Sequence, residues 1–352
     1  MTSPDTAFQA IRLHKDNDSL SASLDELNAF VRRLYGAVRH VEHLSRGDLP
    51  EGEVELRVLY SSMNYKDALI ISGKGGNVAG YPHVPGIDLA GIVEASGVPG
   101  FAAGDLVAGT GRGLGEGLWG GYTQRTRLPA DRLVKLPQGV TARQSMVLGT
   151  AGVTAMLAIL EIEKAGLAPG DGPVLVTGAG GAVGSLSVAL LSALGWEVVA
   201  LEKRDERELL EGLGASRVLG LQEFGEMTAK KPLGEAAWAA AVDTVGGEVL
   251  AAVLRSSRYG ACIAACGMLA GFDVPVTLHP FFARAVRLIG IDSVTCPDAL
   301  RAKVWERLVP LAATAERTAS VEEIALAEVP ERFSAFLEGK ARARLLVQVS
   351  PG

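Results

Sequence analysis

Residues 174 to 185 read Val174-Leu-Val-Thr-Gly-Ala-Gly-Gly-Ala-Val-Gly184-Ser185. The apolar run at the start predicts a strand, the glycines predict a turn, and the apolar stretch that follows predicts a helix. The turn matches a Gly-x-Gly-x-x-Gly pattern in which Ala179 replaces the first glycine, and Gly181 and Gly184 take the other two places. Such a turn is tight and lets the backbone approach a pyrophosphate, which the N-terminus of the following helix attracts. The segment therefore predicts a dinucleotide-binding turn, with a glycine-rich turn that binds no ligand as the alternative.

The charged residues after the next predicted strand bear on which dinucleotide is bound. Glu202 lies 18 residues after Gly184, where an acidic residue would bind the ribose of NAD. Lys203 and Arg204 follow at once and would suit the 2′-phosphate of NADP. The two signals disagree, and a solvated charged loop that binds neither group is a third interpretation.

The chain changes character near residue 145. Before it, Val54–Val58 alternates apolar and polar residues, and short strand-like runs lie between turns rich in glycine and proline, which predicts a compact β domain. After it, strand-like and helix-like segments alternate, as in a doubly wound parallel sheet of the Rossmann kind and an α/β fold. The alternating segments are Pro173–Thr177, Ser185–Leu194, Glu197–Leu201 and Glu206–Leu213. Leu345–Val349 predicts one more strand, which would return to the first domain.

An early segment resembles neither domain. Ser23 and Glu26 have the spacing of a capping box, and the apolar residues that follow have helical spacing. We therefore predict an amphipathic helix over residues 24–39. His40 and His43 at its end could form a metal pair, but histidines on the surface of a helix end are the simpler interpretation.

Composition limits the classes of function. The 352 residues, 48% hydrophobic and 21% charged, suit a soluble chain of about two domains, and a net charge of −6 without a basic run does not favour nucleic-acid binding. We expect no membrane span, because charged and small polar residues interrupt the apolar stretch 186–201, and no signal peptide in the first ten residues. Cys262, Cys266 and Cys296 are too few for a disulfide scaffold and indicate a reducing compartment, the cytoplasm. No cysteine precedes residue 262, so we predict no cysteine-rich zinc lobe and interpret Cys262 and Cys266 as buried small hydrophobes.

Several stretches together resemble the medium-chain dehydrogenase/reductase superfamily, and above all its zinc-free branch of NADPH-dependent acryloyl-CoA reductases, which are often called quinone oxidoreductases. Besides the glycine turn, the matching stretches are Ser61-Ser-Met-Asn-Tyr-Lys-Asp67, Val84-Pro-Gly-Ile-Asp-Leu-Ala-Gly91, Trp119-Gly-Gly121, Gly149-Thr-Ala-Gly-Val-Thr-Ala-Met156, Gly214-Ala-Ser-Arg-Val-Leu219, Val242-Asp-Thr-Val-Gly246, Ala265-Cys-Gly267 and Arg287-Leu-Ile-Gly-Ile-Asp-Ser293. Their order and spacing hold from about Gly52 to the end of the chain.

The resemblance implies a GroES-like β domain, residues 1–147 with 294–352, and a Rossmann domain, residues 148–293, with the nicotinamide in the cleft between them. It implies Tyr65 at the nicotinamide with Asn64 beside it, both as candidate catalytic residues. It implies no metal, because Ile87 stands where zinc-dependent relatives carry histidine. The cofactor contacts that it implies, besides Tyr65, are Gly180, Gly181, Ala182, Val183, Gly184, Glu202, Lys203, Arg204, Arg217, Gly267, Leu269, Arg284 and Arg344.

The expected activity is hydride transfer from NADPH to the activated C=C bond of an α,β-unsaturated thioester such as acryloyl-CoA. NADH stays open as the cofactor, because the family usually has Ser or Thr, then Gly, where this chain has Glu202 and Lys203. The alternatives are reduction of quinones or small enones and, from another class, a non-catalytic NADPH-binding protein. We expect a homodimer that binds a small-molecule substrate, and neither nucleic acid nor a membrane.

Overall fold

The computed structural model describes residues 7–15, 37–72, 78–228, 231–318, 320–337 and 344–351. The chain divides into two compact units. Unit 1 comprises Met1–Thr150 and Val321–Gly352, and unit 2 comprises Ala151–Ser320. Residues 294–320, which the sequence analysis assigns to the first domain, therefore group with unit 2, where helix α10 (Ala312–Thr318) packs on helix α4 (Ala182–Ala193).

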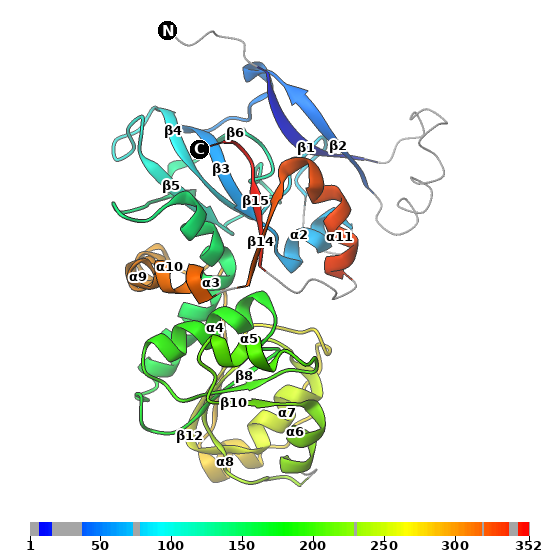
Figure 1. Ribbon diagram of the computed structural model, residues 1–352, viewed down its shortest axis with the longest axis vertical. Coiled ribbons are helices and arrows are strands. Elements are labelled where there is room, and N and C mark those ends of the chain that lie inside the picture. Colours follow the sequence, from blue (N-terminus) through cyan, green and yellow to red (C-terminus); the bar gives the residue numbers. More distant parts are fainter. Residues whose placement is uncertain are drawn as a thin grey trace. The chain divides into compact units, whose positions relative to one another are not determined.

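Unit 1 is built on a mixed, mostly antiparallel sheet. In the described residues its strands follow the order β14-β15-β3-β4-β5-β7, with β6 paired to β3. Figure 1 shows how the C-terminal strand β15 lies between β14 and the blue strand β3, as the prediction of a returning strand near residue 345 requires. The strands are β3 (Val54–Ser62), β4 (Asp88–Ser96), β5 (Leu106–Thr110), β6 (Arg125–Leu128), β7 (Val134–Lys135), β14 (Val321–Ala325) and β15 (Arg344–Gln348).

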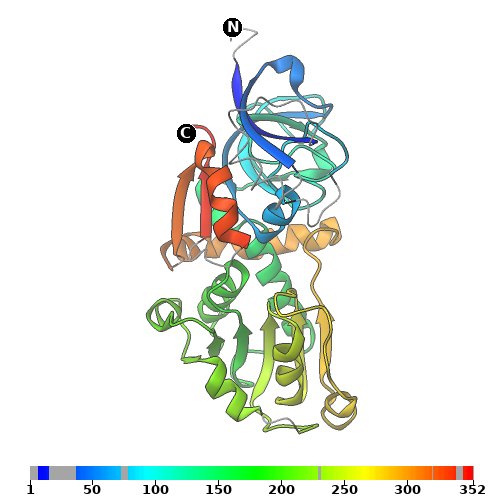
Figure 2. The same ribbon diagram turned by 90° about the vertical axis from the view of Figure 1, so that its right-hand side faces the viewer.

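Two short helices of unit 1 pack on each other at one side of this sheet. They are α2 (Tyr65–Ile71) and α11 (Val329–Leu337), which lie side by side in both views (Figures 1 and 2). Their apolar side chains join a core that includes Ile70, Leu89 and Phe333. Burial of this core fixes the N-terminus of α2, which carries the predicted pair Asn64 and Tyr65.

The N-terminal part corrects one prediction. Strands β1 (Phe8–Lys15) and β2 (Ala37–Leu44) form an antiparallel pair, from Phe8 opposite Leu44 to Lys15 opposite Ala37. The predicted helix over 24–39 is therefore wrong for residues 37–39, because strand pairing with β1 satisfies their backbone groups; residues 24–36 lie outside the described residues. His40 and His43 belong to β2 and not to a helix end.

Unit 2 has the doubly wound fold that the alternating pattern predicts. Its described strands are all parallel, in the order β10-β9-β8-β11-β12-β13. This is the Rossmann order 3-2-1-4-5-6, in which the direction of strand addition reverses between β8 and β11. The strands are β8 (Val174–Thr177), β9 (Val198–Leu201), β10 (Arg217–Leu219), β11 (Trp238–Asp243), β12 (Ser257–Ala265) and β13 (Arg287–Gly290). Besides α4 and α10, its helices are α5 (Arg207–Gly212), α6 (Leu221–Met227), α7 (Gly247–Arg255), α8 (His279–Arg284) and α9 (Asp298–Leu308).

The longest helix, α3 (Ala142–Lys164), begins in unit 1 and ends in unit 2. By length and hydropathy it is the one described helix that could cross a membrane, which the sequence analysis did not consider. However, 89% of its apolar window is buried, as in the core helix of a soluble protein. Its backbone also leaves the helical conformation at Gly149, where φ is 49°.

Candidate functional site

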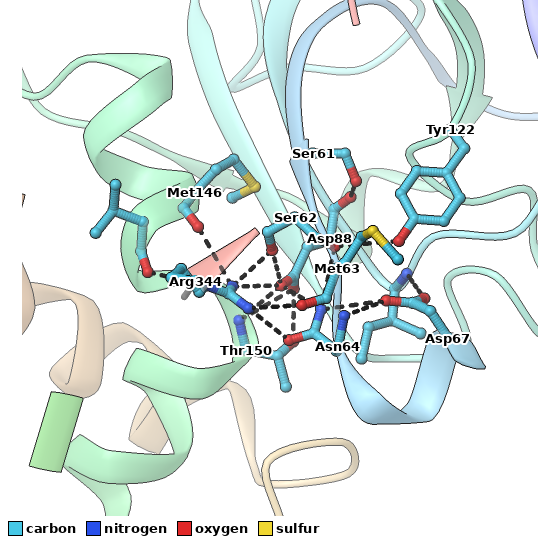
Figure 3. A network of polar contacts seen from close by, with 12 residues as sticks. Ser61, Ser62, Met63, Asn64, Asp67, Asp88, Tyr122, Met146, Thr150 and Arg344 are labelled. Carbon is cyan, nitrogen blue, oxygen red and sulfur yellow. Dashed lines mark hydrogen bonds and ion pairs between the residues drawn. The ribbon is translucent and has the colours of Figure 1, made fainter. Parts of the chain in front are cut away.

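A network of polar side chains lies next to the N-terminus of α2 (Figure 3). We call it the Asp88 cluster, and its members are Ser62, Asn64, Asp67, Asp88, Thr150 and Arg344. Arg344 lies at its centre, and its side chain is 2% exposed. Its Nε donates to the carbonyl of Val147, Nη1 donates to Met63 O and Asn64 Oδ1, and Nη2 donates to Ser62 Oγ, Asp88 Oδ2 and Met146 O, all within 2.6–3.3 Å. A guanidinium has five N–H donors, so protein acceptors occupy every one of them.

Asp88 balances this charge and is fully buried. Its Oδ1 accepts hydrogen bonds from the N–H and the hydroxyl of Thr150, at 3.0 and 2.6 Å. Its Oδ2 accepts from Ser62 Oγ at 2.5 Å and from Asn64 Nδ2 at 2.9 Å, besides Arg344. The carboxylate is therefore held by donors from four separate parts of unit 1.

Gly149 makes this packing possible. A Cβ at this position would lie 2.4 Å from Nη2 of Arg344 and 2.5 Å from Oδ2 of Asp88. Its positive φ is also a conformation that side chains disfavour. The break in α3 therefore brings the backbone N–H of Thr150 into the cluster.

A second buried carboxyl, Asp67, adjoins the first. It accepts hydrogen bonds from the N–H of Ile87 and of Asn64, each at 2.8 Å. Burial, and secondly the charge of Asp88, raise the pKa of Asp67 to about 7. Burial likewise raises the pKa of Tyr122, which packs beside the cluster, well above its usual value. The cluster thus holds two carboxyl groups and one guanidinium in an interior that disfavours an uncompensated charge.

The two predicted catalytic residues differ in their surroundings. The side-chain oxygen of Asn64 accepts from Arg344, and its amide nitrogen donates to Asp88, so both ends of the amide are engaged inside the cluster. Tyr65, the next residue, is 43% exposed, and no described residue hydrogen-bonds to its hydroxyl. The cluster therefore fixes the backbone from which Tyr65 projects.

The glycine turn of unit 2 connects β8 to α4, as predicted. Within the turn, the N–H of Ala179 donates to Leu201 O, that of Gly180 donates to Glu202 Oε2, and that of Gly181 donates to Gly178 O. In the described part of the chain no acceptor pairs with the N–H groups of Ala182, Val183 or Gly184, at the first positions of α4. These three groups are the ones that could hold a pyrophosphate, since the first N–H groups of a helix have no partner within it.

Close packing explains the last glycine of the motif. A Cβ on Gly184 would lie 2.2 Å from the carbonyl oxygen of Gly178 and 2.8 Å from Cα of Ala179. Both are backbone atoms, which cannot move aside without opening the turn. The turn therefore has the close approach of helix and strand that a dinucleotide-binding turn requires.

The other predicted cofactor contacts fall into two groups. Gly267 follows β12 and lies against Thr244, which follows β11, so it belongs to the carboxyl edge of the sheet where the glycine turn lies; Leu269 follows it and is 65% exposed. Arg284 donates to the carbonyls of Arg255, Ser257 and Gly234, beside the first residue of β12. Arg284 therefore lies at the amino edge of the sheet, opposite the carboxyl edge where Gly267 and the glycine turn lie. Arg217, at the start of β10, pairs with Glu223 at 2.5 Å and is half-exposed.

The charged stretch after β9 is not simply a solvated loop. Glu202 is 6% exposed, whereas Lys203 is exposed and Arg204 is partly exposed.

Of the cysteines, Cys262 is buried as predicted and burial raises its pKa to about 11, while Cys266 is only half-buried and its pKa rises to about 12. Among the described residues no three His, Cys, Asp or Glu side chains form a group that could hold a metal ion.

Sequence reasoning missed the partners of the predicted residues. Asp67 and Asp88 lie inside the quoted family stretches but were given no role, and Glu206 near the glycine turn was read only as the start of a helix. A signal was present for Asp88, an acidic residue between Ile87 and the apolar residues Leu89 and Ala90. Arg344 was predicted to contact the cofactor, whereas every donor of its guanidinium is directed to unit 1.

Two family models match the chain: the alcohol dehydrogenase GroES-like domain over residues 50–138, and the zinc-binding dehydrogenase over residues 182–313. A relative in Escherichia coli K12, named "Probable acrylyl-CoA reductase AcuI", is 48% identical over 88% of this chain and 95% of its own length. The yhdH oxidoreductase of Salmonella enterica in complex with NADP is 44% identical, with a TM-score of 0.87, over 97% of this chain and 100% of the other. The yhfP protein of Bacillus subtilis with NAD bound is 38% identical, with a TM-score of 0.87, over 97% and 99%.

These likenesses extend over both units and agree with the order of the motifs. The chain belongs to the medium-chain dehydrogenase/reductase superfamily of oxidoreductases, in the branch of the acryloyl-CoA reductases and their quinone oxidoreductase-like relatives.

Proposed function

We propose that this chain reduces the activated C=C bond of an α,β-unsaturated thioester such as acryloyl-CoA, with hydride from NADPH. The relative named as an acrylyl-CoA reductase and the relative with bound NADP support the reaction and the cofactor. The observation that carries the proposal is the contrast at the start of α2, where Tyr65 is 43% exposed and the polar groups behind it are buried and hydrogen-bonded.

The proposed roles follow from this contrast. When bound, the reduced nicotinamide would supply a hydride to the β-carbon of the substrate. Negative charge then develops on the thioester oxygen, and we assign the Tyr65 hydroxyl as the donor that stabilises it. A proton from water at the α-carbon completes the reduction. Asn64 is the positioning residue, because its amide joins the backbone before Tyr65 to Asp88 and Arg344. The N–H groups of Ala182, Val183 and Gly184 would hold the pyrophosphate.

The chemistry of the chain's own residues supports a metal-independent reaction. Arg344 already neutralises Asp88, and the side chain of Ile87 has no atom that binds a metal. The three cysteines are free thiols, which suits the cytoplasm. A tyrosine hydroxyl can serve as the donor in place of a metal ion when the only charge to be stabilised is on one oxygen.

The test is oxidation of NADPH followed by its absorbance, with acryloyl-CoA, crotonyl-CoA and a benzoquinone as parallel substrates. We expect the largest kcat/KM with acryloyl-CoA. A larger kcat/KM with the benzoquinone would replace the proposal by the quinone reductase alternative. No turnover with any of the three, together with tight NADPH binding, would favour a non-catalytic binding protein.

We also propose a homodimer that uses the edge of the unit 2 sheet. Strand β13 pairs only with β12 among the described strands, and Leu288 on it is 41% exposed. Phe272, Leu278 and Phe282, in the segment just before it, are 61–84% exposed, and an unpaired edge with apolar side chains favours association. Sedimentation should give twice the mass of one chain, and Leu288→Asp should lower it; a monomeric wild type would refute the proposal.

A further inference from the structure

A glycine-rich loop, residues 111–121, follows β5 in unit 1. At its start, the N–H of Gly111 donates to the carbonyl of Ile87 at 2.8 Å. At its end, a Cβ on Gly121 would lie 2.0 Å from the carbonyl oxygen of Asp88. Both ends of the loop are therefore fixed by backbone contacts beside the Asp88 cluster.

The middle of the 111–121 loop is tied to the first turn of α2. Nζ of Lys66 lies 2.6 Å from Oε2 of Glu116, and the two side chains are 34% and 16% exposed. Lys66 directly follows Tyr65, which is 43% exposed. The loop therefore lies next to the turn of α2 from which Tyr65 projects.

Arg112, in this loop, has a backbone conformation that side chains disfavour. Its φ is 55°, and among the described residues Ala285 is the one other non-glycine residue whose φ is positive. Glycines precede and follow Arg112, with φ of 62° and 86°. A third glycine would adopt this conformation without a steric cost, yet the chain carries an arginine here. Strain of this kind is typical of positions where a side chain binds a ligand.

The charge of the proposed substrate lies far from its reacting bond. The acryloyl group is small and neutral, whereas the CoA part carries several phosphate groups. A guanidinium is the side chain that best matches a phosphate, through two parallel N–H···O bonds. Arg112 is partly exposed, so a bound ligand can reach it, and its positive charge offsets the repulsion between such a substrate and a chain of net charge −6.

We propose that Arg112 binds a phosphate group of the CoA part of the thioester, and so favours CoA thioesters over thioesters without phosphate. This rests on the proposed function, since it concerns the far end of the same substrate. Arg344 cannot take this role, because its side chain is 2% exposed, and Lys66 is paired with Glu116. A contact so far from the reacting bond is the same in the ground state and the transition state, so it affects KM and not kcat.

The test compares acryloyl-CoA with acryloyl-pantetheine, which has the same thioester and no phosphate, at saturating NADPH. Arg112→Gln and Arg112→Gly should each raise the KM for acryloyl-CoA about tenfold or more, with kcat unchanged. Neither should change kcat/KM for acryloyl-pantetheine. Arg143→Gln is the matched control, because Arg143 is an arginine of unit 1 with a 34% exposed side chain that pairs with Glu323. This control should leave both substrates unchanged.

Binding of the product, propanoyl-CoA, separates this proposal from the proposed function, because it needs no turnover. Calorimetry in the presence of NADPH should give a Kd about tenfold or more higher for Arg112→Gln than for the wild type, and equal values for propanoyl-pantetheine. A wild type that binds propanoyl-CoA through Arg112 but reduces no thioester would refute the proposed function and leave this proposal standing.

Two results would overturn the role of Arg112. One is a KM and a Kd for the CoA thioesters that Arg112→Gln does not change. The other is an equal loss with the pantetheine thioesters, which would show that Arg112 only shapes the loop. Thermal unfolding shows whether each variant folds, and if Arg112→Gln does not, Arg112→Gly decides, because glycine adopts a φ of 55° freely.

Discussion

Two arginines predicted as cofactor contacts have opposite surroundings. Arg344 in unit 1 is 2% exposed, and protein acceptors take all of its donors. Arg204 in unit 2 is 30% exposed, and its Nε lies 3.6 Å from Oε1 of Glu202 and 3.5 Å from Oε1 of Glu206. A ligand could reach Arg204 from the solvent, because its side chain is partly exposed, whereas it could reach Arg344 only by taking apart a buried network. Burial, and not residue type, separates a structural cation from one that a ligand can recruit.

We expect the largest loss of stability when Arg344 is removed. Arg344→Met leaves Asp88 buried without its cation, so we expect the free energy of unfolding to fall by about 3–5 kcal/mol. Lys135→Met is the control, since Lys135 is 53% exposed and its ion pair with Asp105 at the surface should contribute little to stability. Urea denaturation measures both. A loss for Arg344→Met no larger than that of the control would show that the cluster is not a structural unit.

The next prediction concerns the exposed residue that the Asp88 cluster supports. Tyr65→Phe keeps the ring and removes the hydroxyl, so kcat should fall about 10²-fold if the hydroxyl stabilises the developing oxyanion. Tyr65→Ala also removes the ring and should weaken cofactor binding. If the ring only packs against the nicotinamide, Tyr65→Phe will be nearly silent while Tyr65→Ala still weakens binding. Wild-type kcat and Kd in both variants would remove Tyr65 from the site.

A third prediction concerns Asp67, the second carboxyl group of the Asp88 cluster. The pKa of Asp67 is about 7 in the folded chain against a model-compound value of 3.8, so the folded state binds this proton more tightly. The stability that Asp67 contributes is therefore complete below about pH 4 and is lost as the pH rises through about 7. Asp67→Asn, which resembles the protonated form, should flatten this dependence, so that Tm measured from pH 4 to pH 8 falls less than in the wild type. Asp131→Asn, at an exposed carboxyl, should follow the wild-type curve.

The sequence predicted the parts of the molecule that local pattern determines. The strand, glycine turn and helix at 174–194, and the strands near 54, 198 and 345, follow from periodicity and turn residues, and the structure confirms them. The spacing from the glycine turn also placed Glu202 among the functional candidates, and the family resemblance placed Tyr65 among them.

The rest depends on contacts between residues far apart in the chain. Arg344 meets Asn64 across 280 positions and Asp88 across 256, which no local pattern indicates. Residues 37–39 have helical spacing but pair as a strand with β1, because a partner strand satisfies their backbone. Arg284 lies near the motifs in sequence, yet the chain after β12 returns along residues 266–284 to the opposite edge of the sheet, where Arg284 donates to Ser257.

The smallest expected effect follows from the chemistry around Asp88 and Ile87. A metal ion in this position would need lone pairs of Asp88, but Thr150, Ser62, Asn64 and Arg344 already take them. Ile87 is 2% exposed, and its side chain has no metal-binding atom. Its backbone N–H donates to Asp67, and its carbonyl accepts the N–H of Gly111 at 2.8 Å. The positive charge of Arg344 thus does for Asp88 what a bound cation would do. Incubation with a chelator followed by gel filtration should therefore leave kcat and Tm unchanged, with added zinc giving no gain. Stoichiometric zinc in the active protein, lost together with activity on chelation and restored with it, would show that the guanidinium and the metal do not exclude each other.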